Sequence, residues 1–431
     1  MAHTFQNNTL CLLMAPGLKQ FRLASRQALR PMLIFSICML FFALILFAGS
    51  HNIAEASAYA SNGDSHDTAF LAANQISLNL PILPPVSILS PKNTTYTVSE
   101  IPLTFKVNAP ISWAGYSLDG RANTTIVGNT TLTNLAQGLH SVVIYFNDTA
   151  GEMAPTQTIY FTVGQVSILE IIPLGIIQGL TEWLPVSSTA HLKIAQYLMN
   201  FEATAFLDVT LHIGTLIVVV FYFRKDVKEI LSALVHLDFK SEYGRLIPLI
   251  IVATIPTGII GILYAGFLEN TFQTLLIIGI TFLIGATYLY SSRIGKENIG
   301  TITLTMAFIM GTAQGLASFP GLSRSGVTIS TALLLGLKRE KAFKFSFLLS
   351  IPAIIGDLAF EAYHSRGQFA IQNVVPIELL VGIVLAAVAG YFAIRLVSNL
   401  VRSKRFHYFA FYTWILGITL IALTLSGLLT I

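Results

Sequence analysis

Three ionisable side chains lie within long apolar stretches of the chain. Glu182, His191 and Arg324 are flanked by runs of Leu, Ile, Val, Ala and Gly. An ionisable group in such a stretch is costly, so it usually has a polar partner or faces a water-filled cavity. The Arg324 guanidinium is a planar fork that matches phosphate oxygens, and Glu182 can accept a proton or bind a divalent cation. Together these residue types indicate phosphoryl transfer.

A single His or Glu in a membrane segment is more often an interfacial or helix-pairing group than a catalyst. Three ionisable groups near the ends of two related segments therefore favour a functional site. His212, in another apolar stretch, is a weaker candidate. An imidazole there is equally well explained as a hydrogen-bonded packing residue.

Hydroxyl side chains accompany the charged groups where a helix is expected to begin. The free N–H groups and the positive dipole end of a helix N-terminus bind anions. A serine at this place is most often a helix cap, and capping is the simpler interpretation of any one of them. A helix that begins near Ser187 also places His191 one turn further on, which allows a His–Ser contact. The hydroxyl residues concerned are Ser187, Ser188, Thr189, Ser323, Ser325 and Thr328.

The segments that carry these groups resemble each other. Residues 175–191 and 311–328 share Gly, Gln, Gly, Leu, an aromatic residue and Ser at an offset of 136 positions (311 minus 175), with the proline displaced by one. The pattern indicates an internal duplication. Three expected membrane spans separate the copies, and an odd number makes the copies inverted repeats that enter the membrane from opposite faces. We therefore expect their tips to meet near the midplane.

The composition requires that part of the chain lies in lipid. Only 11% of the 431 residues are charged and 54% are hydrophobic, against roughly 25% charged in soluble proteins. A soluble enzyme, a disordered scaffold and a coiled coil are excluded, because each needs more polar surface. The net charge of +4 is too small and scattered to predict a nucleic-acid partner. Cys11 and Cys38 are the only cysteines, so there is no disulfide framework.

Residues 165–431 are predicted to form a mainly α, polytopic membrane domain. Six stretches have the roughly 20-residue length that spans a bilayer. Four shorter pieces fall into two pairs, each broken by a hinge rich in Pro and Ser, and we expect both pairs to be re-entrant helical hairpins. The long stretches lie near 205–223, 246–268, 273–291, 342–363, 376–397 and 408–430, and the short pieces at 166–181, 185–200, 301–317 and 326–337.

The positive charges predict one orientation in a plasma membrane. Lys and Arg are concentrated in four loops near 224–245, 293–296, 338–344 and 402–405. All four loops are cytoplasmic if residue 165 lies outside, as the positive-inside rule requires. The N-terminal part agrees, because residues 1–30 form a basic cytoplasmic N-terminus. The apolar segment 31–49 is then a transmembrane anchor or, alternatively, a cleaved signal.

Residues 50–84 are predicted to be a linker, and residues 85–164 a small extracytoplasmic all-β sandwich. Short runs that alternate apolar and polar side chains indicate half-buried strands. The domain is slightly short for an immunoglobulin fold and lacks its Cys…Trp…Cys signature, so "immunoglobulin-like" is a fold-level expectation. Four Asn-x-Ser/Thr sequons indicate glycosylation or simply a composition rich in Asn and Thr. They begin at Asn93, Asn123, Asn129 and Asn147.

Two motifs resemble those of a known family. Residues 178–191 (QGLTEWLPVSSTAH) and 320–330 (PGLSRSGVTIS) are similar to the two signature motifs of the undecaprenyl-diphosphate phosphatase family, of the bacitracin-resistance type. The later run 345–349 (FSFLL) also fits. The resemblance covers about residues 165–431 and says nothing about the N-terminal anchor and sandwich.

The resemblance implies a membrane hydrolase that removes the terminal phosphate of a polyprenyl diphosphate of the undecaprenyl or dolichyl type. The product is the monophosphate lipid carrier for envelope polysaccharide or glycan synthesis. The family's fold has six transmembrane helices and two re-entrant hairpins, and its site opens to the outer face. The resemblance also implies a divalent cation, Mg²⁺ or Ca²⁺, for which this sequence offers Glu182 as the one strong ligand.

The family's site residues carry over by motif. Glu182 is the acidic residue, Ser187 and Ser188 are the hydroxyls, and His191 is the histidine. Family members often have a second Glu where Gln178 stands, and because Gln cannot act as a base, a two-acid metal site is in doubt. The substrate-binding residues are expected to be Gln178, Ser187, Thr189, Ser323, Ser325 and Thr328, beside the catalytic Glu182, Ser188, His191 and Arg324.

Two mechanistic questions stay open at this level. Ser188, activated by His191 or Glu182, attacks the terminal phosphorus, or the same residues activate a water molecule. A polyprenyl-phosphate flippase is the rival function, because secondary transporters are also built from inverted repeats with broken helices. The sandwich adds the expectation of an extracytoplasmic partner or glycan of unknown identity.

Overall fold

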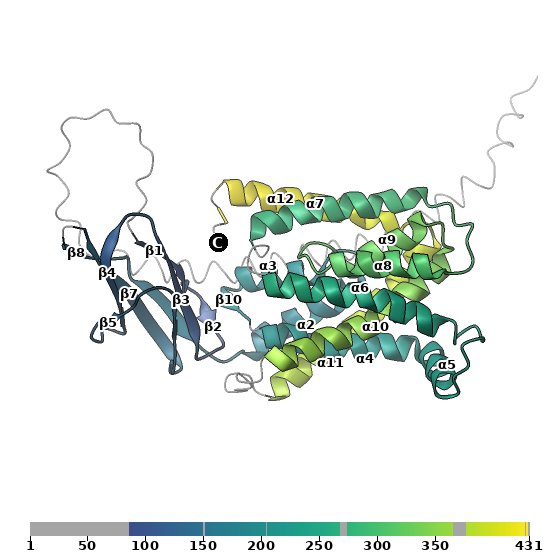
Figure 1. Ribbon diagram of the computed structural model, residues 1–431, viewed down its shortest axis with the longest axis horizontal. Helices are drawn as coiled ribbons and strands as arrows, with labels where there is room; N and C mark the ends of the chain where they lie inside the picture. Colours follow the sequence, from purple (N-terminus) through teal and green to yellow (C-terminus); the bar gives the residue numbers. More distant parts are fainter. Residues whose placement is uncertain are drawn as a thin grey trace, which may run out of the picture. The chain divides into compact units, whose positions relative to one another are not determined.

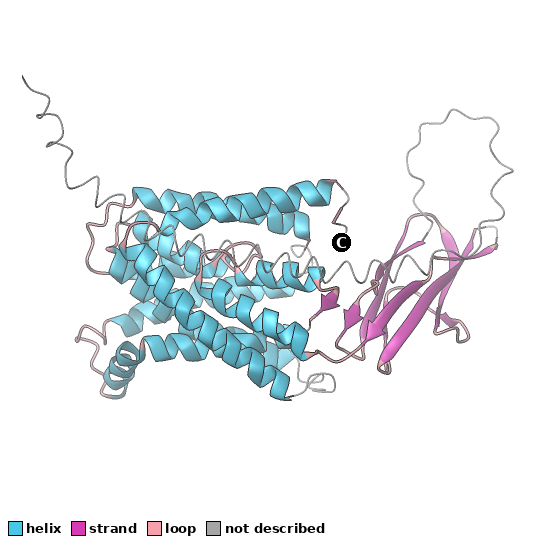
Figure 2. Cartoon of the chain, turned by 180° about the vertical axis from the view of Figure 1, so that it is seen from behind, coloured by secondary structure: helices cyan, strands magenta, loops and turns pink. Residues whose placement is uncertain are grey.

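The computed structural model describes residues 86–149, 151–203, 205–267, 274–364, 376–426 and 428–429. The predicted basic N-terminus, the anchor or signal and the linker lie outside these ranges. All of the described residues belong to one unit of the chain, Gly63–Ile431. Figure 1 and Figure 2 show that the described chain consists of a group of strands followed by a group of helices.

The strands form two sheets that share one apolar core. A three-stranded antiparallel sheet has the order β1-β3-β6, and a larger sheet has the order β10-β2-β9-β7-β4-β5, with β8 paired to β7. Leu103 of β3, Ile144 of β7 and Phe161 of β9 are buried in the same cluster, so side chains from both sheets meet. The strands are β1 (Val86–Ser90), β2 (Thr95–Tyr96), β3 (Ile101–Val107), β4 (Ile111–Leu118), β5 (Thr124–Thr125), β6 (Thr130–Leu132), β7 (Gly138–Asp148), β8 (Met153–Pro155), β9 (Ile159–Val163) and β10 (Phe201–Glu202).

This arrangement agrees with the predicted β-sandwich. Along β7 buried and partly exposed residues alternate, as expected of a strand with one face on the core. The finer expectation of an immunoglobulin-like topology stays a prediction.

The helices follow the predicted order of long and short apolar segments. Five of the described helices are long and apolar enough to cross a membrane, and a sixth span results if the bent pair α4 and α5 is counted as one. The long helices are α4 (Ala205–Tyr222), α6 (Leu246–Phe267), α7 (Leu275–Ser291), α10 (Arg339–His364), α11 (Pro376–Arg402) and α12 (Phe409–Leu425). The shorter ones are α2 (Ile168–Trp183), α3 (Ser188–Leu198), α5 (Arg224–Val235), α8 (Leu304–Leu316) and α9 (Arg324–Leu334).

Helix α5 lies in a segment that was predicted to be a basic loop. It is bent by 82° from α4. Its charged residues lie in the first half, whereas Leu231, Leu234 and Val235 in the second half are exposed apolar residues. A helix of this composition suits the interface between lipid and water, where charged and exposed apolar side chains are both accommodated. The loop prediction missed it because a positive-inside count records charge and ignores periodicity.

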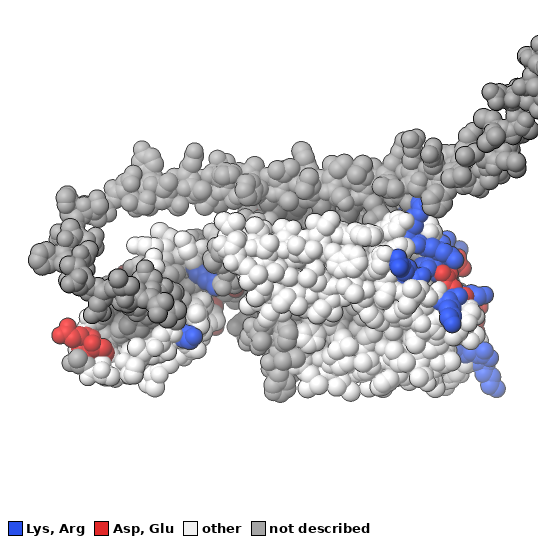
Figure 3. All heavy atoms as spheres, turned by 90° about the horizontal axis from the view of Figure 1, so that it is seen from above, with Lys and Arg blue, Asp and Glu red and all other residues white. Residues whose placement is uncertain are grey.

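The four basic loops lie together at one end of the helical part. Ion pairs join them: Lys341 contacts Glu242 at 2.9 Å, and Arg339 and Lys404 contact Glu297 at 2.8 and 3.6 Å. Figure 3 shows Lys and Arg gathered at this end, while the long side of the helices in view is uncharged. The structure thus confirms that the basic loops share an end, as the topology requires.

Glycines allow the two short hairpins to pack closely on long helices. Gly175 and Gly179 of α2 face α11, where a Cβ on Gly179 lies 2.3 Å from the Ala386 carbonyl oxygen. Gly311 of α8, the repeat counterpart of Gly175, faces α6, where a Cβ lies 2.0 Å from the Ala253 carbonyl oxygen. Small residues spaced four apart are a common device for close helix contact in membranes. The duplicated glycines therefore position both turns of the repeat.

Replacing Gly179 by alanine is expected to destabilise the protein, because α2 and α11 must move apart to make room for the methyl group. Overpacking of this kind costs about 1–3 kcal/mol. The measurement is thermal unfolding of the purified protein in detergent. Gly258→Ala is the matched control, since nothing lies within 4 Å of its added Cβ. Equal unfolding midpoints for the two variants would contradict this packing account.

Candidate active site

Two turns, one from each hairpin, meet at the candidate active site. The α2–α3 turn covers residues 184–187, and the α8–α9 turn covers residues 317–323. The Gly321 N–H donates to the Ser187 hydroxyl oxygen at 3.1 Å, and the Ser323 hydroxyl donates to the Leu184 carbonyl at 3.3 Å. The tips therefore lie in contact, as the duplication predicts.

Local backbone structure sets the direction of the serines. Ser323 caps α9, because its hydroxyl oxygen accepts from the Gly326 N–H at 3.1 Å. Ser187 precedes α3 but makes no such cap, and it has a positive φ of 70°. A non-glycine residue with this φ is strained and is held by its surroundings. Capping thus accounts for Ser323, whereas Ser187 joins the two turns.

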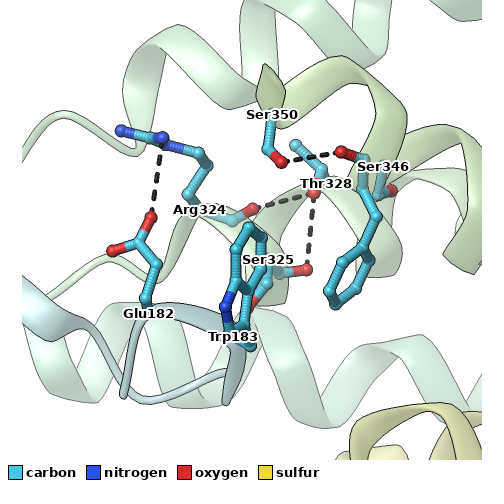
Figure 4. Close-up of a pocket in the computed structure, with 8 residues that line it drawn as sticks. Glu182, Trp183, Arg324, Ser325, Thr328, Ser346 and Ser350 are labelled. Carbon is cyan, nitrogen blue, oxygen red and sulfur yellow. Dashed lines mark hydrogen bonds and ion pairs between the residues drawn. The ribbon is translucent and has the colours of Figure 1, made fainter. Parts of the chain in front are cut away.

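Arg324 lies between two carboxylates. Its Nη2 is 2.7 Å from Asp357 Oδ2, and its Nη1 is 3.6 Å from Glu182 Oε1. Nη1 is buried and has no hydrogen-bond partner. Figure 4 shows the guanidinium directed toward Glu182 across the pocket. A buried donor without a partner is costly, so Arg324 has capacity for an anionic ligand.

Polar side chains from three helices surround the Glu182 carboxylate. Its Oε2 accepts from the Ser188 hydroxyl at 2.7 Å and from the Gln178 amide at 3.1 Å, and it lies 3.5 Å from His212 Nε2. The Glu182 side chain is only 4% exposed. A carboxylate that accepts from a serine hydroxyl is in position to take that proton. The structure therefore brings together an acceptor, a hydroxyl and a phosphate-binding cation.

His212 contributes more to this cluster than its sequence alone indicated. Its Nδ1 lies 2.9 Å from the Asp208 carbonyl, which can only accept, so Nδ1 carries a proton. Nε2 is consequently the nitrogen that faces Glu182. Packing alone therefore does not explain His212, because Nδ1 bonds to the backbone of its own helix and Nε2 lies beside Glu182.

His191 is placed differently. Its Nδ1 is 2.7 Å from the Ser187 carbonyl and therefore donates, while its Nε2 is 2.8 Å from the Tyr412 hydroxyl. Both ring nitrogens are engaged, and the ring stacks on Tyr412 with the planes 17° apart. The predicted His–Ser contact exists, but it is made to the backbone of Ser187 and not to the hydroxyl of Ser188.

Two pockets adjoin Glu182 and Arg324, and together they contain most of the predicted site. One of them is drawn in Figure 4. The other is lined by Thr181, Glu182, Ser187, Ser188, Thr189, His212, Ala317, Leu322, Ser323 and Arg324. The pocket in Figure 4 is lined by Glu182, Trp183, Arg324, Ser325, Thr328, Ser346, Phe347 and Ser350.

Of the predicted residues, Gln178 and His191 do not line either pocket and instead contact residues that do. Gln178 donates to Glu182, and His191 holds the Ser187 carbonyl. The Thr328 hydroxyl donates to the Arg324 carbonyl at 2.8 Å, so its first role is within α9. Asp357, Ser346 and Ser350, all on α10, were missed. Asp357 is an ionisable residue in an apolar span, and the argument applied to Glu182 would have found it.

The described residues do not form a divalent-cation cage. No group of three or more His, Cys, Asp or Glu side chains suited to a metal occurs among them. Glu182 Oε2 already accepts two hydrogen bonds, and Oε1 faces the positive Arg324. These residues alone do not fit a resident cation, and the expected Mg²⁺ or Ca²⁺ stays a prediction.

Comparison with known proteins gives a consistent match to the helical part. Residues 171–419 match the family described as Bacitracin resistance protein BacA. A protein named undecaprenyl-diphosphatase from Carboxydothermus hydrogenoformans is 40% identical over 261 residues, which cover 59% of this chain and 96% of that protein. One of the same name from Korarchaeum cryptofilum is 39% identical over 267 residues, 60% of this chain and 100% of that protein. Both turns lie inside the matched segment.

Proposed function

The chain belongs to the bacitracin resistance protein BacA family, and we propose that it hydrolyses undecaprenyl diphosphate to the monophosphate and inorganic phosphate. It is a multi-pass membrane protein. The observation that carries the proposal is the junction of the two turns, where a buried Arg324 nitrogen without a hydrogen-bond partner lies beside the Glu182–Ser188 hydrogen bond. An anion-binding fork next to an activated hydroxyl is what phosphoryl transfer requires. The flippase alternative needs no such hydroxyl and is not favoured.

The reaction proceeds in two displacements. Arg324 binds the terminal phosphate of the diphosphate and neutralises charge as it develops. Glu182 Oε2 takes the Ser188 proton as Oγ bonds to the terminal phosphorus, and the bond from that phosphorus to the bridging oxygen breaks. Polyprenyl monophosphate leaves and takes that proton from Glu182, which restores the carboxylate. Water then attacks the phosphoserine as Glu182 accepts a proton from the water, the bond from phosphorus to Ser188 Oγ breaks, and inorganic phosphate is released. Glu182 finally returns its proton to Ser188 Oγ.

His191 acts through Ser187 in this scheme. The Tyr412–His191 pair fixes the strained Ser187 carbonyl, and this fixes the start of α3, from which Ser188 projects. His212 Nε2 lies 3.5 Å from Glu182 Oε2 and attracts the carboxylate when the ring is protonated. Glu182, not His191, is therefore the base assigned to Ser188.

We extend the proposal to the arrangement of the chain in the membrane. The α2–α3 and α8–α9 pairs are re-entrant hairpins of an inverted repeat, and the six long segments span the bilayer. The shared basic end is cytoplasmic, and the pocket opens to the outer face, where the sandwich also lies. The matched glycines of α2 and α8, each packed on a long helix, support the duplication.

Release of inorganic phosphate by the purified protein in detergent tests the function. Substrates are polyprenyl diphosphates of several chain lengths, and no membrane gradient is present. We expect release with undecaprenyl diphosphate, because hydrolysis needs only the site. An absence of release in detergent together with lipid transfer between the leaflets of vesicles would assign the chain to the flippase class.

A further inference from the structure

Asp357 is a charged residue of the site that the two-displacement scheme leaves unused. It lies on α10, in a segment apolar enough to cross a membrane, where a carboxylate is costly. Its Oδ2 is 2.7 Å from Arg324 Nη2, the shortest contact that the guanidinium makes with either carboxylate. The Asp357 side chain is nevertheless 53% exposed, against 24% for Arg324.

Asp357 bonds to one of the two terminal nitrogens of Arg324 and leaves the other without a hydrogen-bond partner. A guanidinium binds phosphate best when two of its N–H groups bond to oxygens of the same group. In this structure Nη2 donates to Asp357, while Nη1 is buried without a hydrogen-bond partner, 3.6 Å from Glu182 Oε1. A phosphate that binds both nitrogens therefore comes beside the Asp357 carboxylate and competes with it for Nη2.

Of the two carboxylates, Asp357 is the one suited to be replaced. Glu182 is 4% exposed and accepts from Ser188 and Gln178, so displacing it leaves those donors without their acceptor. Asp357 is half exposed, so its carboxylate can move away from Arg324 without breaking a buried cluster of hydrogen bonds. The site thus has one fixed carboxylate and one exchangeable carboxylate on the same arginine.

We propose that Asp357 is an internal competitor for the phosphate site of Arg324. It occupies the guanidinium when no anion is bound, yields to the terminal phosphate of the substrate, and returns as inorganic phosphate leaves. The proposal rests on the proposed function, since it assumes that Arg324 binds the substrate's phosphate. Its consequence is weaker binding of every phosphate ligand than the arginine alone would give, and faster release of the product.

The test is the affinity of Asp357→Asn for phosphate. Removing the competing charge is expected to lower the KM for undecaprenyl diphosphate and the inhibition constant of inorganic phosphate together, each by roughly 2- to 10-fold. Asp357→Glu keeps the charge and is expected to restore values near those of the native protein. Glu242→Gln is the matched control, because Glu242 is an exposed carboxylate paired with Lys341.

Direct phosphate binding separates this proposal from the proposed function. The thermal unfolding midpoint is measured in detergent over a series of inorganic phosphate concentrations. We expect Asp357→Asn to reach half of its stabilisation at a lower phosphate concentration than the native protein. An unchanged or higher concentration overturns the competitor role. If no polyprenyl diphosphate is hydrolysed, the proposed function fails, while the phosphate series still decides the role of Asp357.

Discussion

Replacing Arg324 by alanine is expected to reduce phosphate release from undecaprenyl diphosphate by roughly 10³-fold or more, as is typical when an arginine that stabilises a transferring phosphoryl group is lost. The change removes the Nη1 donor, which has no hydrogen-bond partner, and the cation that pairs with Glu182 and Asp357. Both the binding of substrate and the stabilisation of developing charge are lost. The measurement is initial-rate phosphate release by purified protein in detergent.

Two further variants make the Arg324 result specific. Arg324→Lys keeps the charge but not the planar fork, so its rate is expected to lie between those of the alanine variant and the native protein. Arg402→Ala removes an exposed arginine at the basic end and is expected to be close to native. Phosphate release by Arg324→Ala within a factor of two of the native rate would show that the site lies elsewhere.

Glu182→Gln is the second large effect. Glutamine is nearly the same size and can still accept a hydrogen bond from Ser188, but it cannot take the proton that leaves the hydroxyl. We expect kcat to fall by roughly 10²- to 10⁴-fold, the usual contribution of a general base, with little change in KM. Steady-state kinetics with undecaprenyl diphosphate separates the two constants.

Glu170 provides the matched control for this prediction. It lies on the same helix, and its carboxylate accepts from the Ser167 N–H at 2.7 Å at the start of α2, outside both pockets. Glu170→Gln is expected to keep nearly native kcat. If Glu182→Gln raises KM and leaves kcat unchanged, Glu182 contributes to binding and the base must be another group.

The sequence predicts the helical part well because its signals are strong. Apolar runs of membrane-spanning length and two interrupted pairs are visible without any structure. The matched glycines, Gln and Ser of residues 175–191 and 311–328 indicate the duplication, and the tips do meet through Ser187 and Gly321. The α5 helix escapes prediction because its charges were assigned to a loop.

The residue types of the site could be predicted from the sequence, but the orientation of each side chain could not. Glu182 and Arg324 were identified because charge is rare in apolar segments, and the structure places them 3.6 Å apart. The sequence predicts a catalytic role for His191 equally well, yet its Nε2 is hydrogen-bonded to Tyr412, which is 221 positions away in the chain. Asp357 likewise becomes part of the site only because α10 lies beside α9. Contacts between distant segments leave no local signal.

A structure of the full protein with a non-hydrolysable, methylene-linked analogue of undecaprenyl diphosphate would show where the diphosphate binds. We expect the terminal phosphonate within hydrogen-bond distance of both Arg324 terminal nitrogens, with the Ser188 oxygen facing its phosphorus and Asp357 released from the arginine. A bound analogue whose headgroup lies away from the two turns, with Arg324 still held by Asp357, would contradict this expectation.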